Sequence, residues 1–106
     1  MLLIINNRDL VMKVDQRKKV SAFQADFKKE FGVGIRLYQG NRLADDVALR
    51  SLSPEGTKGG DIDFGGNTKV KNVEKAFLKE LGIKVQVENT KGGLANNDKT
   101  LASLIK

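Results

Sequence analysis

The clearest pattern along the chain is a pair of apolar stripes at helical spacing, fifty residues apart. Residues three and four positions apart share one face of a helix, so each stripe predicts an amphipathic helix with one buried side. A glycine directly follows each stripe, where a residue in the left-handed conformation commonly ends a helix. The stripes and their glycines are Val20, Phe23, Phe27, Phe31 and Gly32 in the first segment, and Val70, Val73, Phe77, Leu81 and Gly82 in the second.

Alternating patterns after both helices predict strands. Ile35 and Leu37 alternate with polar residues, and the same alternation recurs fifty residues later. A period of two is typical of a half-buried strand. A short apolar stretch also precedes each helix, at 10–14 and at 62–64. Each segment therefore predicts a strand, a helix and a second strand.

The two segments are copies of one sequence. FKKEFGVGIRLY at 27–38 is matched by FLKELGIKVQVE at 77–88, in an alignment that runs without a gap over about 27 positions. LADDVALRSL at 43–52 then matches LANNDKTLASL at 94–104 with one residue inserted. A match of this length indicates an internal repeat, because chance does not produce it.

The linker between the copies, SPEGTKGG at 53–60, contains the only proline and indicates an exposed loop. A sheet of two or three strands buries too little surface to be stable by itself, so neither copy is expected to fold alone. We therefore predict a single domain, 1–106, made of two internal repeats at about 10–52 and 60–104.

The fold class follows from the single apolar stripe on each helix. Such a helix most simply covers one face of a sheet, which predicts an α+β two-layer sandwich of two βαβ repeats. Both helices would lie on one face of a mixed or antiparallel sheet. The βαββαβ order resembles the ferredoxin-like arrangement.

A second resemblance is to the ubiquitin-like β-grasp. In that alternative, 1–5 and 10–14 form an opening hairpin, 61–64 closes the sheet, and the second copy is a C-terminal βαβ extension. The repeated F-x-K-E-[FL]-G and L-A-x-x-x-x-L-x-S-L phrases also resemble a class of small bacterial proteins with two internal repeats, a resemblance that implies no particular activity. Fold alone does not determine function.

Composition and charge exclude some chemistry. The chain has no histidine and no cysteine, which excludes Ser–His and Cys–His catalysis, the usual zinc sites and disulfides. Its net charge of +6 favours polyanionic partners. The longest apolar run, 1–5, is far shorter than the roughly 20 residues of a membrane span, and it lacks the pattern of a signal peptide. We therefore expect a cytoplasmic protein with no membrane partner.

The best candidate binding surface is basic. Arg17, Lys18 and Lys19 directly precede the first helix, whose N-terminus is the positive end of the helix dipole. Three cations there are not what stability alone favours, and together with the helix N–H groups they suit a phosphate or another anion. The remaining candidates for binding an anion or nucleic acid are Arg36 and Tyr38, on the outward side of the next strand, and Arg42.

The one conspicuous carboxylate pair, Asp45 and Asp46, has two interpretations. Adjacent carboxylates in a loop can bind a hard cation such as Mg²⁺. A purely structural role is simpler, with one of them capping the turn that begins at Val47. We therefore predict no catalytic residue, no metal site and no cofactor.

The sequence favours a non-enzymatic protein-binding or self-associating module, with a protein partner or a homo-oligomer. Short sheets leave strand edges that can pair with another chain. The alternative is binding of nucleic acid or another polyanion through the basic surface at the start of the first helix. A carboxylate- and metal-dependent enzyme is the third hypothesis, and no group of residues supports it.

Overall fold

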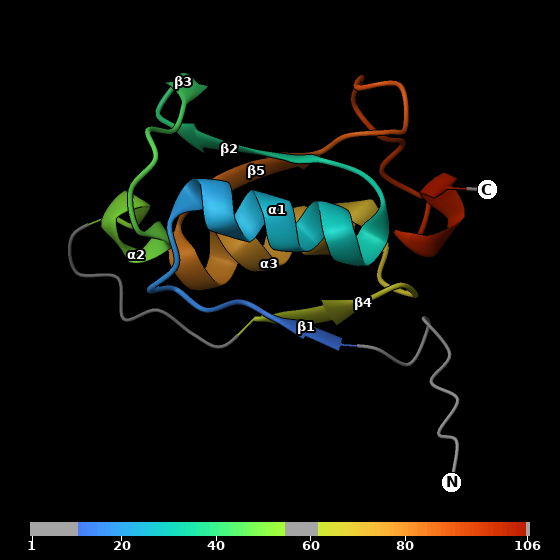
Figure 1. The fold of residues 1–106 in the computed structure, drawn as a ribbon, viewed down its shortest axis with the longest axis horizontal. Helices are drawn as coiled ribbons and strands as arrows, with labels where there is room; N and C mark the ends of the chain where they lie inside the picture. Colours follow the sequence, from blue (N-terminus) through green and yellow to red (C-terminus); the bar gives the residue numbers. More distant parts are fainter. Residues whose placement is uncertain (1–10, 55–61, 106) are drawn as a thin grey trace, which may run out of the picture.

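The computed structural model describes residues 11–54 and 62–105. Two twelve-residue helices, α1 and α3, run side by side in opposite directions, with strands above and below them (Figure 1). The protein is therefore a compact α+β globule. The elements in chain order are β1 (Val11–Lys13), α1 (Val20–Phe31), β2 (Ile35–Gln39), β3 (Arg42–Leu43), α2 (Leu49–Leu52), β4 (Asp63–Gly65), α3 (Val70–Leu81), β5 (Lys84–Val87) and the 3-10 turn η2 (Ala102–Ile105).

Both helices begin and end where the apolar stripes predict. All four stripe positions of each helix are buried. Gly32 and Gly82 close the helices in the left-handed conformation, with φ of 76° and 67°. Across the described ranges, no helix has the length and apolar character needed to cross a membrane.

The strands pair between the two copies. In one sheet β1 lies antiparallel to β4, with Met12 opposite Phe64. In the other, of order β3–β2–β5, Ile35 lies opposite Val87 and Arg36 opposite Gln86. Each of these ladders thus takes one strand from each copy, whereas the short β2–β3 hairpin lies within the first copy.

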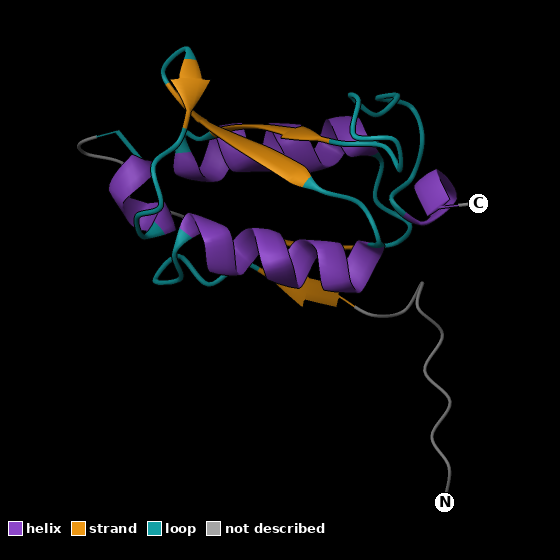
Figure 2. Ribbon diagram, turned by 45° about the horizontal axis from the view of Figure 1, so that its top comes forward, coloured by secondary structure: helices purple, strands orange, loops and turns teal. Residues whose placement is uncertain are grey.

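The prediction of one sheet with both helices on the same face is not confirmed. The described strands form two small sheets on opposite sides of the helix pair (Figure 2), so the structure does not show the ferredoxin-like topology. The physical reason is that the apolar stripes of the helices contact both sheets. Phe27 and Phe77 reach Phe64 of β4 on one side, at centroid distances of 5.8 and 6.1 Å, while the helices pack against β2 and β5 on the other.

The β-grasp alternative rests partly on residues 1–10 and 61, which lie outside the described ranges. Of its opening hairpin, only β1 is described, and β1 pairs with β4. The strands that carry Ile35 and Val87 belong to the other sheet.

The trailing turn of each copy docks on the start of its own helix. The N–H of Leu49 donates to the carbonyl of Lys18 at 2.8 Å, and that of Leu101 donates to Thr68 at 3.0 Å. Both leucines are fully buried. The repeated phrase after β2 and β5 therefore closes the core at the helix N-termini.

Substitution of Gly32 tests its role in ending α1. A Cβ at this position would lie 2.9 Å from Cγ2 of Ile105, and the residue has a φ of +76°. Gly32→Ala is therefore expected to lower the free energy of unfolding by more than the roughly 1–2 kcal/mol that a left-handed alanine costs. Gly40→Ala is the control, since Gly40 has a φ of +65° and no atom of another described part of the chain lies within 4 Å of the added Cβ. Urea denaturation measures both, and equal losses would show that the Ile105 contact is unimportant.

Candidate functional site

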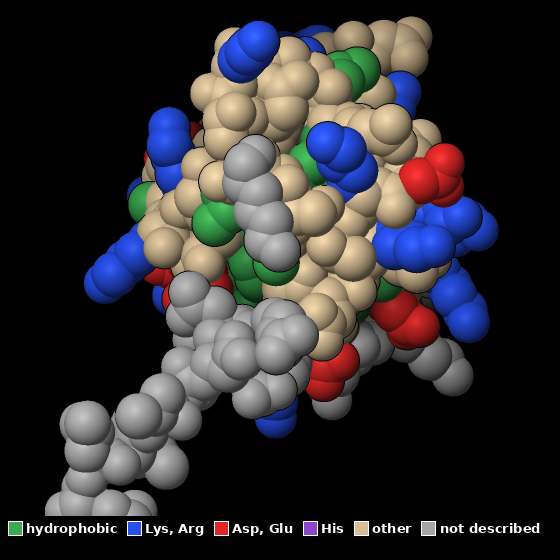
Figure 3. All heavy atoms as spheres, turned by 90° about the vertical axis from the view of Figure 1, so that its right-hand side faces the viewer, with side chains coloured by type: hydrophobic (Ala, Val, Ile, Leu, Met, Phe, Trp, Pro, Cys, Tyr) green, Lys and Arg blue, Asp and Glu red, His purple; other side chains and the backbone are tan. Residues whose placement is uncertain are grey.

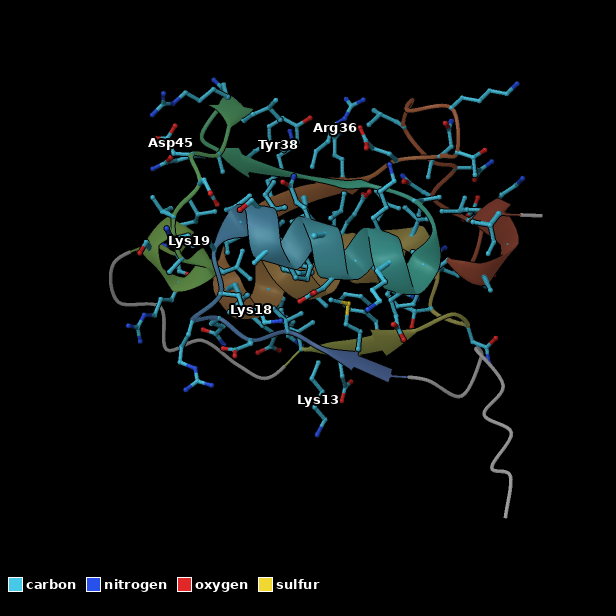
Figure 4. All side chains as sticks on the ribbon, in the orientation of Figure 1. Lys13, Lys18, Lys19, Arg36, Tyr38 and Asp45 are labelled. Carbon is cyan, nitrogen blue, oxygen red and sulfur yellow. The ribbon has the colours of Figure 1, made fainter. Side chains whose placement is uncertain are left out.

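The structure divides the six basic and aromatic candidates between two places. Lys18 and Lys19 lie at the start of α1, and Arg36 and Tyr38 point outward from the sheet of β2 and β5 (Figure 4). Arg17 precedes Lys18, and Arg42 lies in β3 beyond the end of β2. The first helix and the outward strand face thus hold separate groups of candidates.

At the start of α1, two of the three cations have carboxylate partners. Arg17 Nε lies 3.1 Å from Asp15 Oδ1, and Lys18 pairs with Asp26. The hydrogen bonds from Arg17 hold the pKa of the Asp15 carboxyl below its usual range, and Asp26 raises the pKa of Lys18. Much of the predicted positive charge is therefore balanced within the chain.

The N-terminus of α1 also binds a carboxylate of the chain itself. Asp46 accepts hydrogen bonds from the Ser21 N–H and the Ser21 hydroxyl, both at 2.9 Å. These bonds, together with the charge of Lys19, lower the pKa of Asp46. Asp46 therefore occupies the position expected for a bound anion, and it caps α1 instead of its own turn. Asp45 lies instead near Arg42, with 3.6 Å between Oδ2 and Nη2.

Asp46→Asn is expected to destabilise the protein at neutral pH, because the depressed pKa shows that the folded state favours the charged carboxylate. That stability contribution is present above the usual carboxyl pKa and is lost as the pH falls through the lowered value, below about pH 4. The difference between the variant and the wild type should therefore shrink in acid. Asp45→Asn is the matched control and is expected to have little effect. Urea titrations at pH 7 and pH 3 measure both, and a difference that stays constant in acid would contradict the capping role.

On the outward face of the sheet, the polar side chains bind one another. Arg36 Nε lies 2.8 Å from Glu88 Oε2, and its Nη2 donates to the carbonyl of Gly92 at 2.8 Å. The Tyr38 hydroxyl donates to Gln86 Oε1 at 2.6 Å. The Glu88 carboxylate raises the pKa of Arg36. This face is a connected polar surface without a second aromatic side chain for stacking bases.

Basic residues do not gather into one patch on the end of the molecule shown in Figure 3, where lysines and arginines are spread around the periphery with acidic side chains among them. Within residues 11–54 and 62–105, no group of three or more acidic, histidine or cysteine side chains is arranged to hold a metal ion.

Sequence analysis missed a candidate site at the edge of β5 that faces away from β2. Hydrogen-bonded pairs alternate along an antiparallel ladder. Because the Glu88 N–H donates to the Gly34 carbonyl at 2.9 Å, the next bonded pairs are Arg36 with Gln86 and Tyr38 with Lys84. Val85 lies between these last two pairs, so its N–H and C=O point away from β2, and no described residue supplies a partner for either group.

The next residue of this edge is already occupied. The Val87 carbonyl accepts the Ala95 N–H at 2.9 Å, and the Val87 N–H donates to Glu74 Oε2 at 3.3 Å. Partial burial raises the pKa of Glu74, while the Val87 N–H acts in the opposite direction. Glu74 thus acts as a built-in acceptor beside the open position at Val85.

A groove of about 360 Å³ runs beside this edge, between β5 and α3. Leu78 is 61% exposed in it, although it is a large apolar residue. Lys71 also lines the groove, and its Nζ lies 3.3 Å from Oδ1 of Asp98. The groove is lined by Lys71, Glu74, Lys75, Leu78, Lys84, Val85, Gln86 and Asn97.

A comparison of the two copies could have indicated this groove. Leu78 aligns with Lys28, and Glu74 aligns with Gln24. The groove is thus lined partly by residues at which α3 differs from α1.

Comparisons with models of protein families, with curated proteins and with solved structures found no match to this chain. The geometry of the molecule itself must therefore carry the functional argument.

Proposed function

We propose that the protein is a non-enzymatic protein-binding module that takes an extended segment of a partner along the free edge of β5. The observation that carries this proposal is Val85, whose N–H and C=O both point away from β2, beside a groove in which Leu78 is exposed. An extended peptide adds to a sheet through such main-chain groups, while side-chain pockets provide specificity.

The β2 edge of the same sheet does not offer this arrangement. An antiparallel partner forms a reciprocal pair with one residue that presents both its N–H and its C=O. The Ile35 carbonyl accepts the Gln24 side chain at 2.9 Å, and the Leu37 carbonyl accepts the Ala44 N–H at 2.9 Å. Neither Ile35 nor Leu37 therefore offers a complete pair.

The described strands of the β1–β4 sheet carry exposed charged side chains. Lys13 on β1 and Asp63 on β4 are exposed. The hollow beside β1 is lined mainly by charged residues such as Lys18, Asp26 and Lys29. Charged side chains on an edge oppose pairing with another chain, and the β5 edge also carries one, Lys84. Leu78 beside β5 favours pairing there, because covering it removes apolar surface from water.

Polyanion binding remains a second prediction from the sequence, and the observations favour it less. Arg17 and Lys18 pair with carboxylates, and Asp46 binds the N-terminus of α1. Binding of nucleic acid that survives removal of Leu78 would support that prediction over strand addition.

The proposal can be tested with Leu78→Lys, which gives α3 the residue that α1 has at the aligned position. Ten-residue peptides selected from a random displayed library for binding to the wild-type protein should bind the variant at least about tenfold more weakly, a loss of about 1.4 kcal/mol. Lys28→Leu is the matched control and should leave binding unchanged. Isothermal titration calorimetry measures the affinities.

Amide hydrogen exchange locates the binding. The Val85 amide should exchange faster than those of Arg36 and Gln86 in the free protein and should slow when a selected peptide binds. Peptides that bind Leu78→Lys as tightly as the wild type, or that leave the Val85 amide unprotected, would contradict the proposal.

A further inference from the structure

We infer that each copy of the repeat binds the unlike copy selectively, in its own chain or in a second chain of the same sequence, and that charged residues on an approximate twofold axis disfavour the pairing of like copies. The determinants are the pairs Lys13–Asp63 and Arg36–Glu88. This inference does not rest on peptide binding at β5. It assigns the protein a second association, in which two chains exchange halves.

The two copies are related by an approximate twofold axis. Positions 50 residues apart are equivalent, and Met12 lies opposite Phe64, the equivalent of Val14. In the other sheet the same relation holds for Ile35 and Val87. Between these sheets α1 and α3 run in opposite directions, so a half-turn about an axis through both sheets exchanges the copies (Figure 1). The same surface of each copy therefore meets the other copy, as in a symmetric dimer.

In the described ladders, two positions lie on this axis, where a residue faces its own equivalent. Lys13 lies opposite Asp63, and Arg36 lies opposite Gln86. Figure 4 shows Lys13 and Arg36 on opposite sides of the helix pair. At these positions two like copies would bring identical side chains together, whereas unlike copies bring different ones. A sequence difference here therefore selects one pairing over the other.

The position in the β1–β4 sheet selects by charge. Lys13 and Asp63 are both exposed and have opposite charges. Residues directly opposite each other point to the same face of a sheet, where opposite charges stabilise the pair and like charges destabilise it. Two first copies would place Lys13 opposite a second Lys13, and two second copies would do the same with Asp63. Both like pairings are therefore disfavoured.

The position in the β2–β5 sheet disfavours the pairing of two first copies. Arg36 Nε lies 2.8 Å from Glu88 Oε2, and the two side chains are only 33% and 27% exposed. The equivalent of Glu88 in the first copy is Tyr38. Two first copies would therefore place Arg36 opposite a second Arg36 and remove its carboxylate partner. A partly buried charged group that loses such a hydrogen bond is destabilising.

Side-chain size in the core acts in the same direction. Phe64 lies between Phe27 and Phe77, with ring centroids 5.8 and 6.1 Å away, whereas its equivalent in the first copy is Val14. Unlike copies thus bring one large and one small side chain to these equivalent places. Two first copies would leave a cavity where Phe64 lies, and two second copies would overpack the position of Val14. Both changes are destabilising.

The contacts between the copies do not require that both belong to one chain. Both main ladders cross from one copy to the other, and so do ring contacts such as that of Phe27 with Phe64. Two chains can therefore exchange halves, with the first copy of each on the second copy of the other, as in a swapped dimer. The residues on the axis keep this exchange between unlike copies.

Introduced cysteines test the exchange, because the chain has none of its own. Tyr38 and Lys84 lie opposite each other, at a spacing that suits a disulfide. Full-length Tyr38→Cys and Lys84→Cys chains are unfolded together in urea, refolded at high protein concentration and oxidised with glutathione. Mass spectrometry counts the dimers. The ratio of mixed to same-variant dimers should be at least about fivefold higher than for the same chains mixed without unfolding.

Charge variants of these two chains test the selection. With Lys13→Asp in one chain and Asp63→Lys in the other, each chain pairs like charges internally, and exchange restores opposite charges in both halves. With both substitutions in one chain and none in the other, exchange creates the like pairs instead. Mixed dimers should be at least about tenfold more abundant in the first arrangement, and the difference should shrink with added salt.

Arg36→Glu and Glu88→Arg, arranged in the same two ways, should act in the same direction. Lys29→Asp in one chain and Glu30→Lys in the other are the charge-matched control, because both residues are exposed on α1 away from the axis. This control should leave the yield of mixed dimers unchanged. Circular dichroism confirms that each variant is folded.

Two outcomes would overturn the inference. A random ratio of mixed to same-variant dimers after refolding, in every combination of chains, would show that the halves do not bind across chains. Equal yields from the two arrangements of Lys13→Asp and Asp63→Lys would show that the charges on the axis do not select the pairing.

Discussion

Phe27→Ala is expected to lower the free energy of unfolding by about 3–5 kcal/mol, the range for truncating a buried phenylalanine. Phe27 is fully buried in α1. Its ring centroid lies 4.9 Å from that of Phe31, 5.8 Å from that of Phe64 and 6.1 Å from that of Phe23. The variant therefore leaves a cavity where α1, β4 and neighbouring aromatic rings meet. Because domains of this size are commonly stable by only about 5–15 kcal/mol, this loss is a large part of the total.

Urea denaturation of the wild type and the variant measures this loss. Leu78→Ala is the matched control, because Leu78 is a large apolar residue on a helix but is 61% exposed. Its change should stay within about 0.5 kcal/mol. A loss below about 1 kcal/mol for Phe27→Ala would show that the site collapses around the truncated side chain and would contradict a tightly packed aromatic core.

The second large effect is expected when the copies are separated. A fragment of residues 1–54 should show no cooperative unfolding transition, although it contains all of α1. Its β1 and β2 strands lose β4 and β5, and of the described strand ladders the fragment keeps the two-residue pairing of β2 with β3. An isolated helix of twelve residues is marginal in water, and so is a two-stranded hairpin.

Far-UV circular dichroism and urea titration test the fragment. Mixing it with a fragment of residues 55–106 should restore the helical signal, because the missing strands return as the second chain. The intact chain is the control. Cooperative unfolding of the first fragment alone would contradict the prediction of one domain built from two copies.

Local patterns predicted the helices accurately, and the reason is physical. The spacing of Val20, Phe23, Phe27 and Phe31 marks one helix face, and Gly32 supplies the left-handed stop. These signals act within a dozen residues of chain. The sheet pairing is different, because β1 and β4 have three residues each and their partners are selected by the packing of distant side chains. One sheet and two sheets therefore fit the same sequence pattern.

The candidate site was predicted less well for a similar reason. Charge along the chain identified Arg17, Lys18 and Lys19, but the carboxylate that binds the helix start comes from Asp46, 25 residues beyond Ser21. Nothing in the local sequence places that carboxylate there. The open groups at Val85 depend on strand register and on strand order, which are properties of the folded sheet.

Pairing between the copies also has a consequence for the speed of folding. Met12 meets Phe64, and Ile35 meets Val87, so each main ladder joins positions 52 residues apart in the chain. Loops of that length must close before either ladder contributes any stability, whereas both helices need only local contacts. Folding should therefore be slower than for a helical bundle of equal length, with the closure of these long loops as the step that limits the rate.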